Sequence, residues 1–162
     1  MTISELMLPE LDEEMGRTRK VLAAVPRQHL DWKPAEVLHT IGWNANHLAE
    51  IVGWTSMILQ QDVFDIAPVD GPAYKTPSID DPAKIVASFD EGLVAARSAI
   101  AAATDAVMAE SWTMKMGGQT LFTLSKGACI RTWVLNHSVH HRGILSVYLR
   151  MRGVEFTPVY DG

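Results

Sequence analysis

The sequence has a single cysteine and no long apolar run, and these absences exclude two classes of protein. Cys129 is the one cysteine among 162 residues. One thiol cannot form an internal disulfide, so the chain is not a disulfide-stabilised secreted domain and suits a reducing compartment. No apolar run approaches the ~20 residues that a membrane-spanning helix needs. We therefore expect a cytoplasmic protein that has no membrane partner.

Basic charge is also scarce. The 14 lysines and arginines are outnumbered by 19 aspartates and glutamates, which gives a net charge of −5, and the basic residues are scattered. Binding to a phosphate backbone requires a concentrated positive surface, so we expect no nucleic-acid partner. The N-terminal stretch MTISELMLPELDEEMG has no basic region ahead of an apolar one, so we also expect no secretory signal.

The motifs of several common chemistries are missing. The sequence contains no P-loop, no G-x-G-x-x-G and no G-x-S-x-G. Cys129 has no C-x-x-C partner, and it lies in an apolar helical stretch. We therefore expect its thiol to be inert rather than nucleophilic.

Four stretches show the three- and four-residue apolar spacing of amphipathic helices. They cover residues 8–25, 40–61, 82–103 and 124–152. Thr40 is a predicted N-cap, and Asp81 followed by Pro82 is a predicted helix start. Pro9 is expected in the first turn of the first helix, where its missing N–H does no harm, and Pro26 ends that helix.

A short hairpin is predicted before the last helix. In SWTMKMGGQTLFTL, apolar residues alternate with polar ones, and Gly117-Gly118 supplies the turn. The predicted fold is an all-α, antiparallel four-helix bundle with this small β-hairpin, in one domain spanning residues 1–162. The connection over residues 66–80 is long enough for a crossover between helices.

Three glycines inside predicted helices require an explanation. Gly92 lies on a face of small residues, which favours close approach of a neighbouring helix. Gly127 and Gly143 each cost the last helix about 1 kcal/mol relative to alanine. We expect packing or function to account for both.

Histidines are the most informative residues. His137 and His141 are four residues apart, so their imidazoles project from one face of the last helix. His47 lies in the apolar stripe of the second helix. Bundle cores commonly build metal sites from facing helices, and imidazole nitrogens bind such ions at about 2.0–2.1 Å. The pattern favours a divalent metal site made of His47, His137 and His141.

A structural interpretation of each histidine stays open beside this one. A lone histidine on a buried face is commonly a hydrogen-bonded core residue, and H-x-x-x-H pairs also occur by chance. A buried polar group without a partner costs about 1–3 kcal/mol, however, and one metal ion satisfies a nitrogen of all three residues. Three nitrogens do not select the metal: zinc or nickel is expected first, and iron(II) or manganese also fits.

Two further residues are candidates for proton relay. Glu50 follows His47 by three residues and can orient that histidine, act as a general base, or simply lie at the solvent edge. His140 is one position off the apolar stripe and faces another helix, solvent or the outer side of the site.

Three segments together resemble the DinB-like (DNA-damage-inducible) family of metal-dependent enzymes. They are LDWKP at residues 30–34, TIGWNANHLAE at residues 40–50, and NHSVHHRGILSVYLRMRGVEFTPVYDG at residues 136–162. The last segment is the most specific, since it combines H-x-x-x-H-R-G with Y-L-R and a proline–tyrosine tail. The sequence departs from the family pattern at Ile144, where glutamine is usual, and at His39 before Thr40.

The resemblance implies an up-down-down-up order of helices, a metal triad of His47, His137 and His141, and a homodimer. Family members with assigned activity include transferases and isomerases that use a low-molecular-weight thiol such as bacillithiol or mycothiol. A thiol cosubstrate and a small-molecule substrate are therefore expected here.

Three functional hypotheses follow. In the first, the metal activates a thiol or water against a small electrophilic substrate, as in a transferase or a hydrolase, and Arg142 or Arg150 holds an anionic group of that substrate. In the second, the chain is a non-catalytic metal-binding stress-response protein. In the third, it is a plain helical bundle that binds no metal.

Overall fold

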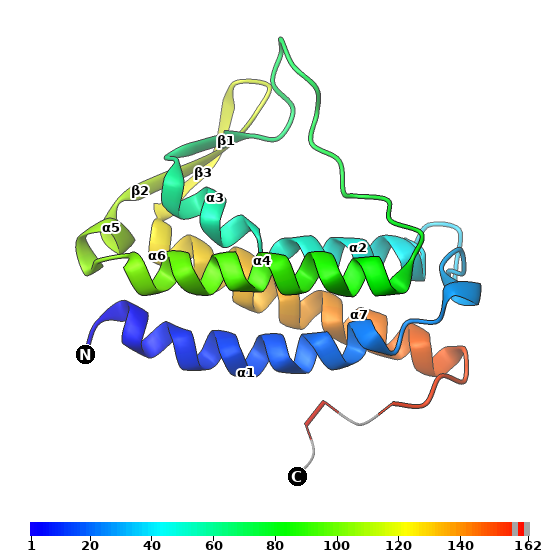
Figure 1. Cartoon of the computed structure of the whole chain (residues 1–162). Coiled ribbons are helices and arrows are strands. Elements are labelled where there is room, and N and C mark those ends of the chain that lie inside the picture. Colours follow the sequence, from blue (N-terminus) through cyan, green and yellow to red (C-terminus); the bar gives the residue numbers. More distant parts are fainter. Residues whose placement is uncertain (157–158, 161–162) are drawn as a thin grey trace.

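The polypeptide is mostly helical and carries one small sheet in the computed structural model, which describes residues 1–156 and 159–160 (Figure 1). The longest helices are α1 (Ile3–Ala23), α2 (Ile41–Ile51), α4 (Pro82–Ala102) and α7 (His137–Met151). The shorter helical segments are η1 (Arg27–His29), α3 (Trp54–Gln60), α5 (Asp105–Ala109), α6 (Lys126–Ile130) and the π-helical η2 (Arg131–Asn136). The strands are β1 (Val63–Asp65), β2 (Ser111–Met116) and β3 (Gln119–Ser125).

The start of α1 lies earlier than the apolar spacing predicts. Thr2 Oγ1 accepts a hydrogen bond from the Glu5 N–H at 3.1 Å, and the Glu5 carboxylate accepts one from the Thr2 N–H at 2.7 Å. This reciprocal capping box fixes the helix start at Ile3. Pro9 consequently lies inside the helix, and its predicted place in the first turn is wrong.

The predicted starts of α2 and α4 are confirmed. Thr40 Oγ1 accepts a hydrogen bond from the Trp43 N–H at 3.0 Å, and Asp81 Oδ1 accepts one from the Ala83 N–H at 3.0 Å. Pro82 is the first residue of α4. These caps satisfy backbone donors that the first helical turn leaves unpaired.

The predicted second helix is divided into α2 and α3 at Val52 and Gly53. The division coincides with the close approach of α4: a methyl group added to Gly92 would lie 3.1 Å from Val52 Cγ1 and 3.5 Å from the Gly53 nitrogen. The small residue predicted to admit a neighbouring helix therefore does so at this junction.

The predicted last helix consists of three consecutive segments, α6, η2 and α7, and it starts at Lys126 with Ser125 as N-cap. The π-helical η2 has a wider turn than an α-helix, and such segments are frequent at functional sites. It ends at Asn136, directly before the first residue of the predicted histidine pair.

The predicted hairpin is part of a three-stranded sheet with the order β1-β2-β3. β2 and β3 are antiparallel, and Gly117 and Gly118 turn the chain with φ of 60° and 78°. β1 pairs with β2 in parallel, so that Val63 lies opposite Thr113. The sequence analysis missed this third strand. The carboxylate of Asp65 accepts hydrogen bonds from the N–H groups of both turn glycines, at 3.1 and 2.7 Å.

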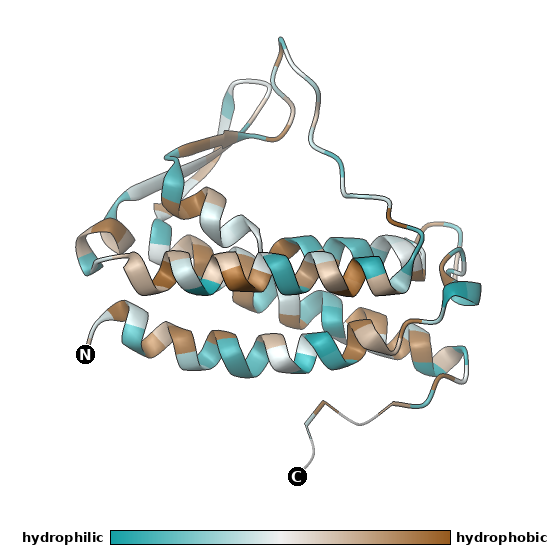
Figure 2. Ribbon diagram, viewed as in Figure 1, coloured by the Kyte–Doolittle hydropathy of each residue, from teal (hydrophilic) through white to brown (hydrophobic). Residues whose placement is uncertain are grey.

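The helices pack on one another around a shared apolar core. α1 lies against α4 and α7, and α2 lies against the same two helices (Figure 1). Figure 2 shows apolar and polar residues alternating along α1 and α4, as expected of helices with one buried face. Across residues 1–156 and 159–160, no helix combines the length and apolar character needed to cross a membrane.

A buried arginine joins α7 to α1. Arg142 is 2% exposed, and its guanidinium donates hydrogen bonds to the Glu14 carboxylate at 2.6 Å, the Glu14 carbonyl at 2.9 Å and the Tyr160 hydroxyl at 2.8 Å. These partners hold the helices together, so Arg142 is not the anion-binding residue that the sequence analysis considered. Pro158, of the proline–tyrosine tail, lies outside the described residues.

The two glycines of the last helix have different surroundings. A methyl group on Gly127 would lie 3.3 Å from the Met108 carbonyl oxygen, so close packing accounts for that glycine. A methyl group on Gly143 would meet nothing within 4 Å. Packing therefore does not explain Gly143.

Gly143→Ala is expected to raise the free energy of unfolding by about 0.4–1 kcal/mol, because alanine favours the helix and restricts the unfolded chain. Gly42→Ala is expected to lower it. The new methyl group would lie 2.9 Å from the Leu30 oxygen that accepts the Gly42 N–H at 2.7 Å. Urea unfolding of both variants beside the wild type measures the two effects. A change of the same sign in the free energy of unfolding of both variants would contradict the different surroundings described for the two glycines.

Candidate metal centre

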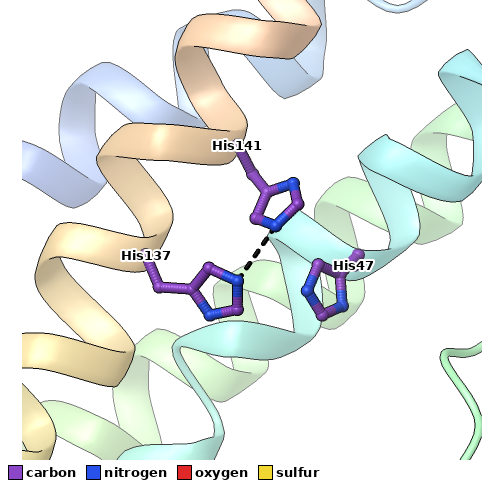
Figure 3. A group of neighbouring side chains, drawn as sticks. All are labelled: His47, His137 and His141. Atoms are coloured by element: carbon purple, nitrogen blue, oxygen red, sulfur yellow. Dashed lines mark hydrogen bonds between the residues drawn. The ribbon is translucent and has the colours of Figure 1, made fainter. Parts of the chain in front are cut away.

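The packing of α2 against α7 brings His47, His137 and His141 together (Figure 3). One ring nitrogen from each lies within 4.8 Å of the other two. The Nε2 atoms of His137 and His141 are 2.9 Å apart, and the His47 ring centroid is 5.1 and 4.6 Å from theirs. The convergence that the spacing predicts is therefore present. His47 is buried, and the other two are partly buried.

The spacing of the nitrogens fits a shared cation. Two nitrogens bound tetrahedrally to one zinc ion at about 2.05 Å are about 3.3 Å apart. The separations here, from 2.9 Å up to a limit of 4.8 Å, bracket that value. Small side-chain movements are enough to bring all three nitrogens to one ion.

Glu50 fixes the ring of His47. Its Oε1 lies 2.9 Å from Nδ1 of His47, and Thr76 Oγ1 lies 3.3 Å from the same nitrogen. The carboxylate accepts the Nδ1–H, which leaves Nε2 as the nitrogen with a free lone pair. Glu50 is mostly buried, with a side-chain exposure of 13%. Of the three interpretations of Glu50, this geometry favours the orientation of a ligand histidine, a common feature of metal sites.

Asn44 has the corresponding position beside His141, and the sequence analysis missed it. Asn44 Oδ1 lies 3.4 Å from Nδ1 of His141, and Asn44 Nδ2 donates to the Thr40 carbonyl at 2.9 Å. The second contact sets the direction of the amide, so the oxygen faces His141. A buried asparagine on the apolar face of α2 was the available signal.

His137 is held less firmly. Its Nδ1 is buried without a well-formed hydrogen bond among the described residues. The backbone of Trp133, four residues earlier in η2, is near enough to raise its pKa, although other effects outweigh it.

Both histidines of α7 are neutral at pH 7. Burial, followed by the nearby His47, lowers the pKa of His137 from its ordinary value near 6.5 to about 4. Burial, followed by His47 and His137, lowers the pKa of His141 to about 3. Neutral imidazole is the form that binds metal, so these residues bind an ion without first losing a proton.

Aromatic rings surround the histidines. Trp43 stacks between His39 and His47, with ring centroids 3.6 and 4.7 Å apart. Trp54 lies with its centroid 5.5 Å from those of both His47 and His137. Both tryptophans therefore adjoin the site.

Hydrogen bonds attach the connection between β1 and α4 to helix α2 beside the histidines. The amide of Asn46 donates to the Ile79 carbonyl at 2.9 Å and accepts from the Ile79 N–H at 2.9 Å. In the same segment, Thr76 contacts His47. These contacts join residues about thirty positions apart, and the sequence analysis did not identify them.

The remaining candidates lie outside the group of three. His140 is exposed, and its ring meets His141 edge-on with centroids 5.0 Å apart. Its role as a proton relay, and that of Glu50, stays a prediction. Cys129 is buried, and burial raises the pKa of its thiol to about 11, so at pH 7 it is not the thiolate that a nucleophile requires.

Comparison with known proteins gives a consistent result. The model of the DinB family matches residues 1–162. A DinB-like protein from Bacillus subtilis has a similar structure with a TM-score of 0.70 and 14% identity, covering 97% of this chain and 99% of that one. A DinB-like protein from Bacillus cereus has a TM-score of 0.67 and 19% identity, covering 92% of each chain. The sequence matches no curated protein. At these identities the structural likeness shows the fold alone.

The cluster predicts metal binding that depends on each histidine. Protein purified without a nickel column should contain near-stoichiometric divalent metal by elemental analysis, and His47→Ala and His137→Ala should each lose it. His29→Ala is the matched control, because His29 lies in η1 and outside the group. Metal retained by both site variants would rule out this centre.

The lowered pKa values predict that the metal-free protein loses stability in acid. Below pH 6.5 the unfolded chain takes up protons on His137 and His141, whereas the folded protein resists them down to about 4 and about 3. The free energy of unfolding should therefore fall as the pH drops from 6.5 to 4. Urea unfolding in EDTA should show a flatter dependence for His137→Gln/His141→Gln than for the wild type; equal slopes would contradict the shifts.

Proposed function

Because this chain belongs to the DinB family and brings three histidines together, we propose that it is a divalent-metal-dependent enzyme that activates a thiol or water against a small electrophilic substrate. The products are those of a thiol-dependent transferase or a hydrolase. The observation that carries the proposal is the convergence of His47, His137 and His141.

The number of ligands supports catalysis over a purely structural role. Within the part of the chain that the structure describes, no fourth histidine, cysteine or carboxylate joins the three histidines. Structural zinc sites have four protein ligands, whereas catalytic sites have three and keep one position for water or substrate. The donor set of this cluster is of the catalytic kind.

The roles of the side chains follow from their contacts. A bound divalent ion supplies Lewis acidity, which lowers the pKa of a water or thiol beside it. Glu50 holds the Nδ1–H of His47, and Asn44 holds that of His141, so the lone pairs of both rings point inward. The proton of the nucleophile is relayed to solvent by Glu50 or by His140, which lies on the exposed side of His141.

The identity of the metal and of the nucleophile, the location, the assembly and the helix order are proposed from the sequence, the family resemblance and the donor chemistry. Zinc or nickel is the first choice of metal, and iron(II) or manganese is the second. A low-molecular-weight thiol is favoured over water as the nucleophile. The protein acts in the cytoplasm as a homodimer, and its long helices form an antiparallel four-helix bundle in up-down-down-up order.

The alternative, a non-catalytic metal-binding stress-response protein, is compatible with the same surroundings. Asn46 fastens the segment around Ile79 over α2, and Trp43 and Trp54 adjoin the histidines. A covered ion serves a sensor as well as an enzyme. The two functions differ in turnover, which can be measured directly.

Thiol transfer to 1-chloro-2,4-dinitrobenzene tests the enzymatic function. The thiol sulfur bonds to the ring carbon, chloride leaves with the electron pair of the C–Cl bond, and the thiol proton passes through the protein to solvent. With bacillithiol or mycothiol, protein loaded with zinc or nickel should exceed the uncatalysed rate by at least about 100-fold, the lower range of general acid–base effects. The absorbance of the thioether product measures the rate.

Matched variants separate the possibilities. His137→Ala and metal-stripped protein should fall to the uncatalysed rate, and His29→Ala should keep the wild-type rate. Glu50→Gln should bind metal but lower kcat. Stoichiometric metal without turnover of any thiol tested, or of water with an activated ester, would favour the non-catalytic alternative.

A further inference from the structure

We propose that the cavity beside the three histidines binds an uncharged aromatic or aliphatic group of the substrate, of about the size of naphthalene. This inference deepens the proposed function, because it names the class of substrate that the metal site would serve.

The cavity lies between the helices and the sheet. Its volume is about 270 Å³, and residues from α3, β1, β2, α6, η2 and the segment after β1 line it. The residues that shape it are Trp54, Phe64, Tyr74, Trp112, Met114 and Trp133. Its wall holds no charged side chain among the described residues, and Tyr74 carries its one hydroxyl group.

The cavity and the histidine cluster share a wall. Trp54 lines the cavity, and its ring centroid is 5.5 Å from those of His47 and His137. Trp133 lines it too, with its centroid 5.9 Å from that of His137. A molecule in the cavity is therefore one aromatic ring away from the proposed ligands.

Tyr74 lies between the polar side chains near His47 and the apolar cavity. Its ring lines the cavity, and its hydroxyl lies near enough to Glu50, Thr76 and Trp54 for each to affect its pKa. Burial, followed by the nearby Glu50, raises the pKa of this hydroxyl, so it stays protonated. Aromatic residues with a polar tip suit such a boundary. The hydroxyl and the carboxylate face the histidine side, whereas the cavity receives apolar surface.

The size and lining of the cavity select the ligand. An apolar cavity of about 150 Å³ takes up benzene, so a space nearly twice as large suits a bicyclic aromatic group or a branched chain of about eight to ten carbons. An unpaired charge is costly to bury there.

The cavity is open to solvent, because Tyr74 and Trp133, which line it, are 39% and 36% exposed. A ligand can therefore enter it from outside. Three tryptophans, Trp54, Trp112 and Trp133, form much of its apolar wall. Cys129 completes the lining with a small, inert side chain.

Naphthalene tests the inference directly, with or without metal. The wild type should bind it with Kd below about 1 mM, and 2-naphthoate should bind at least about 10-fold more weakly, a difference of about 1.4 kcal/mol. In protein loaded with Mn²⁺, whose binding is checked by electron paramagnetic resonance, the proton resonances of bound naphthalene should broaden. Paramagnetic relaxation falls with the sixth power of the distance, so the ion-to-proton distances that it yields report whether the cavity adjoins the metal site.

Variants that fill the cavity provide the control. Met114→Trp should weaken naphthalene binding at least about 10-fold. Leu121→Trp, on the neighbouring strand β3 and 53% exposed, should leave it unchanged. If circular dichroism shows that Met114→Trp does not fold, Cys129→Leu adds a smaller group to the same wall and should also weaken binding.

The outcomes distinguish this inference from the metal function. Naphthalene binding that is insensitive to both cavity variants, or bound naphthalene that Mn²⁺ loading does not broaden, would overturn the inference. Cavity-dependent binding in a protein that takes up no divalent metal would support the apolar site and refute the proposed metal-dependent function.

Discussion

The contact between α2 and α7 places three imidazoles where they have few partners other than one another. Burial keeps His137 and His141 neutral, and their Nε2 atoms lie 2.9 Å apart. Neutral rings this close either share a proton or face a common cation, and the contacts of Glu50 and Asn44 on the outer nitrogens favour the second arrangement. The candidate metal, the order of the surrounding rings and the proposed chemistry all depend on this convergence.

The surroundings of the cluster divide by polarity. On one side, Glu50 and Thr76 both contact Nδ1 of His47, and the hydroxyl of Tyr74 lies near these two side chains. On the other side, tryptophan rings separate the histidines from an apolar cavity. In the proposed reaction, the polar nucleophile and the hydrophobic electrophile would each be desolvated by a different wall.

Local signals predicted much of this arrangement, and long-range contacts account for most of what was missed. The four-residue spacing of His137 and His141, the caps at Thr40 and Asp81, and the turn at Gly117-Gly118 each depend on a few adjacent residues. The pairing of Asn46 with Ile79 and the short strand β1 depend on distant partners, which periodicity does not report. Pro9 shows the opposite case, because a local capping box at Thr2 was readable and was overlooked.

The π-helical segment η2 determines which way the two histidines of α7 face. In an α-helix each residue rotates the chain by about 100°, so the wide turn in η2 sets the angular phase of α7 relative to α6. The same residues wound as an α-helix would turn the chain about 100° further, and would swing His137 and His141 away from His47 while leaving their mutual spacing intact. The π-helical winding of η2, and not only the identity of the histidines, therefore determines that two helices point at the same place.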